Sequence, residues 1–66
     1  MEIINFNKKL YSQQAINSAI AAFSELAHFN LSEASDSWRL EITDIDQQFA
    51  ANIRGEFANY VLGLES

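Results

Sequence analysis

Residues 28–43, with the sequence HFNLSEASDSWRLEIT, decide the fold because apolar and polar side chains alternate on both sides of a short polar stretch. The polar stretch is Glu33–Ser37, which has the composition of a hairpin loop. Alternation with a period of two is typical of a half-buried β-strand. The apolar members are Phe29 and Leu31 before the loop and Trp38, Leu40 and Ile42 after it. The stretch therefore predicts two strands joined as a hairpin with one apolar face.

The residues before this hairpin predict one strand and one helix. In Glu2–Asn7, Ile4 and Phe6 alternate with asparagines, which indicates a short strand. Ser12 is a favourable N-cap residue, and Tyr11 is placed to pack on Ile16 across the first helical turn. The expected apolar side of the helix consists of Ala15, Ile16, Ala19, Ile20, Ala22, Phe23, Leu26 and Ala27. We expect this helix to lie between Ser12 and the strand that begins at His28.

A second helix is expected after the hairpin. Asp44 and Gln47 have the spacing of a capping box, and Asp46 fits the same capping role slightly later. The main apolar stripe of the helix is Phe49, Ile53, Phe57, Tyr60, Val61 and Leu64. Residues 1–66 are thus expected to form a single small α+β domain of order βαββα. Both helices should cover one face of a three-stranded sheet, with the third strand between the first two and antiparallel to both.

Composition and charge limit the classes of function. Nine acidic and four basic residues give a net charge of −5, which disfavours nucleic acid because binding to phosphates depends on Lys and Arg. The longest apolar run, Ala19–Phe23, is too short to cross a bilayer, so no membrane association is expected. The chain begins without the basic and apolar stretches of a secretory signal, which favours the cytoplasm. Because cysteine is absent, apolar packing must hold the small core together.

Residues that bear chemistry are few and have structural explanations. His28 is the only histidine, whereas a general base or a metal site needs several converging groups. Asp44 and Asp46 resemble paired metal-binding acids, but the start of a helix favours negative charge at the same positions. Ser12 is explained as a cap, and no glycine-rich phosphate loop is present. We therefore expect no catalytic residue, no cofactor-binding residue and no metal ligand.

The two glycines, Gly55 and Gly63, both fall in the expected second helix. A glycine inside a helix costs about 1 kcal/mol relative to alanine, so a packing reason is expected for Gly55. We define the small-residue patch as the second apolar group on this helix, made of Ala51, Gly55, Ala58 and Leu62. Small side chains allow another backbone to approach closely. The patch is a candidate interface with another molecule, and packing on the first helix of the same domain is an equally open interpretation.

Two segments resemble a known family. Residues 10–16, LYSQQAI, followed by Ala19–Ser24, resemble the start of HxsD-like proteins, which are accessory members of the His-Xaa-Ser peptide-modification systems. Residues 55–62, GEFANYVL, resemble the terminal helix of that family. The resemblance implies a small companion of a radical-SAM enzyme and of a repeat-bearing precursor peptide. It implies no catalytic residue, because the matching positions are helix caps and core residues.

The leading hypothesis is a non-enzymatic accessory subunit that binds a protein or peptide, namely a radical-SAM enzyme or its precursor peptide, and that forms a homo-oligomer. One alternative is a freestanding homodimeric module that binds a small regulatory ligand between paired sheets. Another is a minimal enzyme that uses His28 with Glu41 or an aspartate. Ligand-dependent stabilisation would favour the first alternative, and loss of turnover on changing His28 would favour the second.

Overall fold

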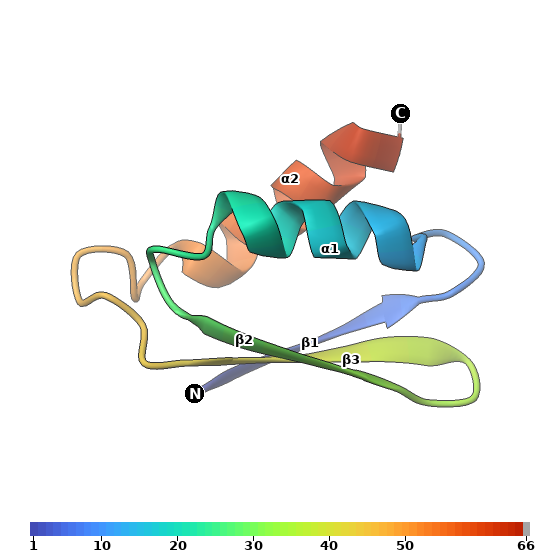
Figure 1. The fold of residues 1–66 in the computed structure, drawn as a ribbon, viewed down its shortest axis with the longest axis horizontal. Coiled ribbons are helices and arrows are strands. Elements are labelled where there is room, and N and C mark those ends of the chain that lie inside the picture. Colours follow the sequence, from blue (N-terminus) through green and yellow to red (C-terminus); the bar gives the residue numbers. More distant parts are fainter. Residues whose placement is uncertain (66) are drawn as a thin grey trace.

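A computed structural model describes residues 1–65 and shows five elements in the order β1–α1–β2–β3–α2 (Figure 1). The elements are β1 at Glu2–Asn7, α1 at Gln13–Ala22, β2 at His28–Glu33, β3 at Ser37–Thr43 and α2 at Ile53–Glu65. The predicted α+β class and the βαββα order are therefore confirmed.

The three strands form one antiparallel sheet in the order β1-β3-β2, as the sequence predicts. Leu40 in the central strand is paired in register with Ile4 of β1 and Leu31 of β2. The hairpin closes where the backbone nitrogen of Ala34 donates to the Ser37 carbonyl oxygen at 2.9 Å. Matching apolar alternation in all three strands fixes this register, because a slip of one residue would turn every apolar side chain toward solvent.

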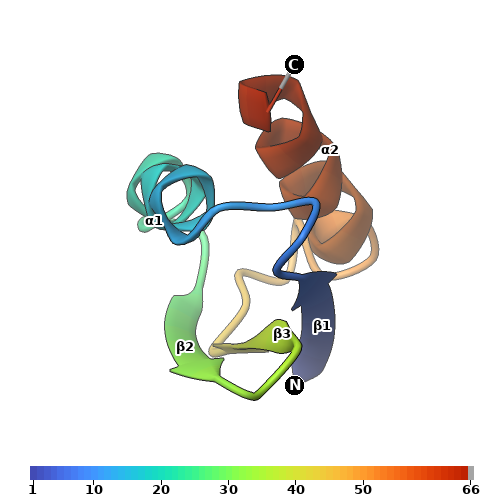
Figure 2. The ribbon, with the colours of Figure 1, turned by 90° about the vertical axis from the view of Figure 1, so that its right-hand side faces the viewer.

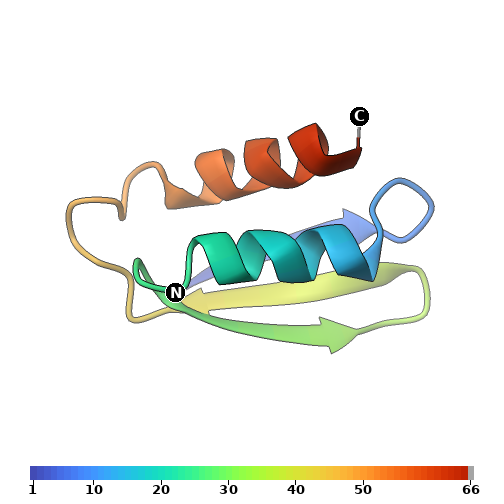
Figure 3. The same cartoon turned by 45° about the horizontal axis from the view of Figure 1, so that its top comes forward.

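Both helices cover the same face of the sheet, with α1 over β2 and α2 over β1 (Figure 2). They lie side by side and run in opposite directions (Figure 3). Between the layers is the buried core, which consists of Ile4, Phe6, Ala15, Ile16, Ala19, Leu40, Ile42, Ile53, Phe57 and Val61. On the opposite face of β3, Arg39 and Glu41 form an ion pair. The predicted separation of apolar and polar strand residues is confirmed.

Phe57 of α2 lies at the centre of an aromatic cluster. Its ring centroid is 6.2 Å from that of Phe6 in β1 and 5.2 Å from that of Phe29 in β2. The ring of Phe23, at the end of α1, lies 5.3 Å away in an edge-to-face arrangement. One side chain thus joins both helices to both outer strands, and ring pairs of this kind stabilise by about 0.5–1.5 kcal/mol beyond burial.

The start of α2 differs from the prediction, because the regular helix begins at Ile53 and not beside Asp44 or Asp46. Asp44 has a positive φ of 50°, which bends the chain after β3 and is incompatible with capping a helix. The Asp46 carboxylate accepts from the Gln48 backbone nitrogen at 3.0 Å, so it supports a local turn. Residues 47–52 form turns before α2 starts.

The first helix is also shorter than its apolar stripe. Regular α-helix ends at Ala22, and the backbone nitrogen of the C-cap residue Phe23 donates to the Ala19 carbonyl oxygen. Leu26 then continues in a turn, where its backbone nitrogen donates to the Phe23 carbonyl oxygen at 2.9 Å. Leu26 and Ala27 still pack against the core, so the periodic pattern identified their burial but placed them in the wrong local structure.

Candidate protein-binding site

The small-residue patch lies on α2 and on the turn that precedes it. Gly55, Ala58 and Leu62 belong to the helix, whereas Ala51 lies in the turn before it. Ala58 is half-buried, and the other three residues are exposed. Beyond its chain neighbours and the backbone of its own helix, a Cβ atom built on Gly55 would meet nothing within 4 Å. At this position the patch therefore leaves room for another molecule and does not pack on α1.

Large apolar side chains remain exposed in the second half of the same helix. The exposed fractions are 44% for Tyr60, 54% for Leu62 and 46% for Leu64. Tyr60 and Leu64 belong to the predicted apolar stripe, but the sheet and α1 cover them only in part. The C-terminal half of α2 rises away from the sheet, which explains the incomplete cover (Figures 1 and 2).

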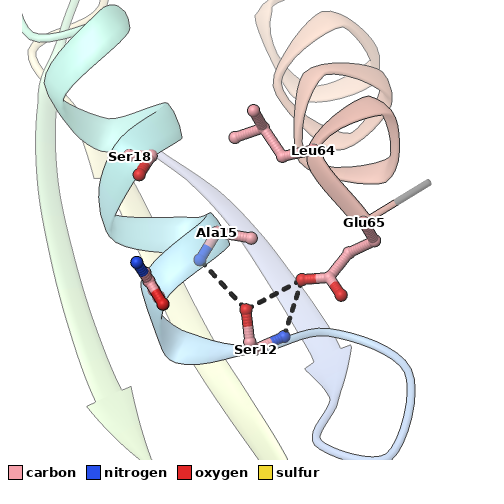
Figure 4. A pocket seen from close by; sticks show the side chains of 6 residues that line it. Ser12, Ala15, Ser18, Leu64 and Glu65 are labelled. Carbon is pink, nitrogen blue, oxygen red and sulfur yellow. Dashed lines mark hydrogen bonds between the residues drawn. The ribbon is translucent and has the colours of Figure 1, made fainter.

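A shallow pocket of about 370 Å³ lies where the end of α2 approaches the start of α1 (Figure 4). Its lining residues are Ser12, Gln14, Ala15, Ser18, Leu64 and Glu65. In Figure 4, Leu64 points from α2 toward α1, and Glu65 points toward Ser12. The pocket thus has one exposed apolar side chain and a polar rim, and it lies on the same half of α2 as Tyr60 and Leu62.

Glu65 and Ser12 form the polar end of this pocket. Oε1 of Glu65 accepts hydrogen bonds from the backbone nitrogen and from Oγ of Ser12, both at 2.9 Å. The hydrogen bond from the Ser12 backbone, followed by that from the Ser12 hydroxyl, lowers the pKa of the Glu65 carboxyl below its usual value. Ser12 Oγ in turn accepts from the Ala15 backbone nitrogen at 3.1 Å, which confirms the predicted N-cap of α1.

Glu65 was not among the sequence-predicted site residues. No neighbouring residue in the sequence identifies Glu65 as a site residue. Its partner Ser12 is 53 residues away, and the contact depends on how the two helices lie on the sheet. The signal that was available is weaker: an acidic residue at the end of α2 is unfavourable for its own helix dipole, so it benefits from a partner outside that helix.

The other candidate residues lie apart from this pocket. His28 is exposed at the start of β2, where its register partner is Thr43, and Glu41 pairs with Arg39 on the helix-free face of the sheet. Among residues 1–65, no group of three or more His, Cys, Asp or Glu side chains is arranged to hold a metal ion. Over the same residues, neither helix has the length and apolarity needed to span a membrane.

No match was found when the chain was compared with protein-family models, with curated proteins and with solved structures. The architecture and the exposed side of α2 define a small α+β domain with an incompletely covered apolar helix surface.

Proposed function

We propose that this chain is a non-enzymatic subunit that binds another protein through the outer side of α2. The observation that carries the proposal is the exposure of Leu62 on the same side of α2 as the open space at Gly55, two helical turns earlier. Burying a leucine side chain fully contributes roughly 1.5–3 kcal/mol, and a glycine lets a partner backbone come close to the helix. Leu62 shares this side of α2 with Gly55 and Ala58, whereas Tyr60 and Leu64 lie about 160° around the helix, toward α1. A partner on the outer side therefore covers Leu62 and the small-residue patch.

The exposure of large apolar side chains on α2 also favours a role of this helix in binding a partner over a purely structural role. In a chain of 66 residues the core is small, so three large apolar side chains on one helix are a substantial fraction of what folding has to bury.

The resemblance to HxsD-like proteins gives this proposal a specific form. In that form the chain is an accessory component of a peptide-modification system, and its partner is a radical-SAM enzyme or the precursor peptide of that enzyme. A cytoplasmic location and self-association through the same helix surface are parts of the same proposal. The net charge of −5 would further favour a partner with a basic contact surface.

The test is a binding titration with purified components. Any radical-SAM enzyme and any precursor peptide found to be encoded beside this chain are each titrated with wild type, Leu62→Glu and a matched control, Asn17→Glu. The control adds the same charge to an exposed position of α1. We expect Leu62→Glu to weaken binding by about tenfold or more, because an unpaired charge would enter an apolar contact, and Asn17→Glu to have little effect.

Two results would contradict the proposal. One is the absence of binding to either component, which would remove the accessory role. The other is equal binding of wild type and Leu62→Glu, which would move the contact away from α2.

A further inference from the structure

The two outer edges of the sheet differ in how they are covered. At the β1 edge, Nε of Arg54 donates to the Ile3 carbonyl oxygen at 3.3 Å. At the end of β1, the Asn7 carbonyl oxygen accepts from the backbone nitrogens of Leu10 and Tyr11, both at 3.0 Å. Side chain and loop therefore occupy part of this edge, which lowers its capacity to accept another strand.

The β2 edge has no such cover among residues 1–65. In an antiparallel pair, the backbone N–H and C=O of one residue both point toward the partner strand, and those of the next residue both point away from it. Because the Ala34 nitrogen donates to Ser37, the even-numbered residues of β2 are the ones that pair with β3. The backbone groups of Phe29, Leu31 and Glu33 therefore point outward, and within the described part of the chain no loop or side chain caps them.

Proteins usually protect edge strands from further pairing with lysine, proline or a bulge. β2 contains none of the three: its sequence is HFNLSE, and its register with β3 is continuous from His28 to Glu33. Phe29 and Leu31 are only half-buried although both pack against the core. Ile20 of α1, one turn after the buried Ile16, is half-buried as well. An added strand would find apolar side chains on the helix side of this edge.

Charge is unevenly distributed and leaves this side of the molecule almost neutral. From Leu10 to Ser32, which includes all of α1 and most of β2, Glu25 is the only charged residue when His28 is neutral. Glu33 at the end of β2 is paired with Lys8, whose Nζ lies 2.5 Å from its Oε2. Depletion of charge is characteristic of the centre of protein interfaces. A strand bound here meets a nearly neutral surface, while the net charge of −5 on the whole chain disfavours acidic partners.

The position of α1 decides between a second copy and a single peptide strand. Paired strands lie about 4.8 Å apart, whereas packed helices need about 8–10 Å between their axes. Because α1 lies over β2, two copies joined edge to edge would bring their α1 helices into the same space (Figure 2). A single extended peptide carries no helix and fits beside β2 with its inward side chains beneath the edge of α1.

We propose that the outer edge of β2 binds an extended peptide as a fourth strand, antiparallel to β2. The peptide has apolar residues at alternate positions, facing Phe29, Leu31 and Ile20, and no net negative charge. The proposal extends the proposed function, since both assign protein recognition to this chain, but it uses an edge of the sheet that is separate from the α2 surface. Backbone hydrogen bonds supply affinity, and the alternate apolar side chains supply selectivity.

The chain is short enough for chemical synthesis, which permits a change to a single backbone group. A phage library of short peptides with alternating apolar and polar residues is selected against the immobilised wild-type chain. Affinities of the selected peptides are then measured for wild type, for a chain with N-methylated Leu31 and for a control with N-methylated Asn5. The control carries the same modification on the β1 edge, and circular dichroism reports whether each chain is folded.

We expect peptides that bind wild type, lose about tenfold or more affinity for the N-methyl-Leu31 chain and bind the Asn5 control normally. Bound peptide should also slow hydrogen exchange at the amides of Phe29, Leu31 and Glu33. Failure to select any peptide, or binding that is unaffected by N-methylation of Leu31, would overturn the proposal. So would a wild-type dimer that the Leu31 modification dissociates, because the occupant would then be a second copy. Leu62→Glu separates the two proposals, since it should leave peptide binding unchanged.

Discussion

Glu65 and Ser12 are joined by two hydrogen bonds although they are 53 residues apart, so the end of α2 is tied to the start of α1. Ser12 Oγ donates to Glu65 and accepts from Ala15, and one hydroxyl thus serves both the cap and the contact between helices. The carboxylate lies at the N-terminus of α1, where the helix dipole and the unpaired N–H groups favour negative charge.

Protonation of Glu65 should weaken this contact. The pKa of its carboxyl lies below the usual value for glutamate in the folded chain, because the carboxylate accepts hydrogen bonds from the backbone nitrogen and then the hydroxyl of Ser12. A lowered folded-state pKa means that the contribution is present above the unfolded-state value and is lost as the pH falls through the folded-state value. We therefore expect thermal stability to drop below about pH 4.5, and this drop should be smaller in Glu65→Gln.

Thermal unfolding followed by circular dichroism at about pH 7 and about pH 3 tests this expectation. Glu25→Gln is the matched control, since it removes a glutamate from the turn after α1 and leaves Ser12 unchanged. An acid-induced loss of stability that is equal in wild type, Glu65→Gln and Glu25→Gln would show that the Ser12 contact does not contribute.

Replacing the N-cap residue should cost more than replacing Glu65. Ser12→Ala removes the acceptor for the Ala15 nitrogen and one of the two donors to Glu65. Loss of an N-cap hydroxyl costs typically about 1 kcal/mol, within a range of about 0.5–2 kcal/mol. Urea unfolding measures the difference, and Ser12→Asp is the informative comparison. It should restore the cap but place two carboxylates together, so full recovery of stability would argue against the Glu65 contact.

Phe57 should be the most sensitive core position because its ring contacts both helices and both outer strands. Replacing a buried phenylalanine by alanine costs about 3–5 kcal/mol, which is comparable to the whole stability of a domain this small. We expect Phe57→Ala to be largely unfolded by circular dichroism at ambient temperature, while Phe57→Leu should remain folded. Tyr60→Ala changes the aromatic ring one helical turn away at a 44% exposed position and is the control. A folded, cooperative Phe57→Ala chain would show that the aromatic cluster is dispensable.

The sheet was predictable from sequence because the alternation of apolar and polar residues within each strand indicates which face of that strand is buried. Leu40 and Ile42 alternate with Arg39 and Glu41, and only one placement of β3 buries the apolar residues of all three strands together. The cap at Ser12 was predictable for a similar reason, since capping depends on neighbours within one helical turn.

The sequence did not predict features that depend on competition between two local structures or on contacts between residues far apart in the chain. The Asp44–Gln47 spacing fits a capping box, but the backbone nitrogen of Asp46 donates to the Leu26 carbonyl oxygen at 2.8 Å, which holds that segment in a turn. Local spacing carries no information about Leu26. The incomplete cover of Tyr60 and Leu64 depends on the direction of α2 relative to the sheet, which side-chain periodicity does not fix.

Gly55→Ala should stabilise the chain. Gly55 is the third residue of α2, has no positive φ, and a Cβ atom there would meet nothing within 4 Å beyond its chain neighbours and the backbone of its own helix. Alanine in place of glycine in a helix interior gains about 0.5–1 kcal/mol when no clash opposes it. Urea unfolding of both chains at low concentration measures this gain. A destabilised Gly55→Ala chain would mean that the open space at Gly55 is filled in solution.

Gly55→Lys tests whether that space is used for self-association. We expect the wild-type chain to associate reversibly through α2. The lysine variant should have a dissociation constant raised about tenfold or more, because it adds bulk and an unpaired charge where two backbones approach. Sedimentation across a dilution series measures both, and Asn17→Lys is the control with the same charge on exposed α1. A wild-type chain that stays monomeric and folded at high concentration would exclude self-association and leave a different protein as the partner at α2. Unfolding of Gly55→Lys would instead place Gly55 against the core, contrary to the open space around it.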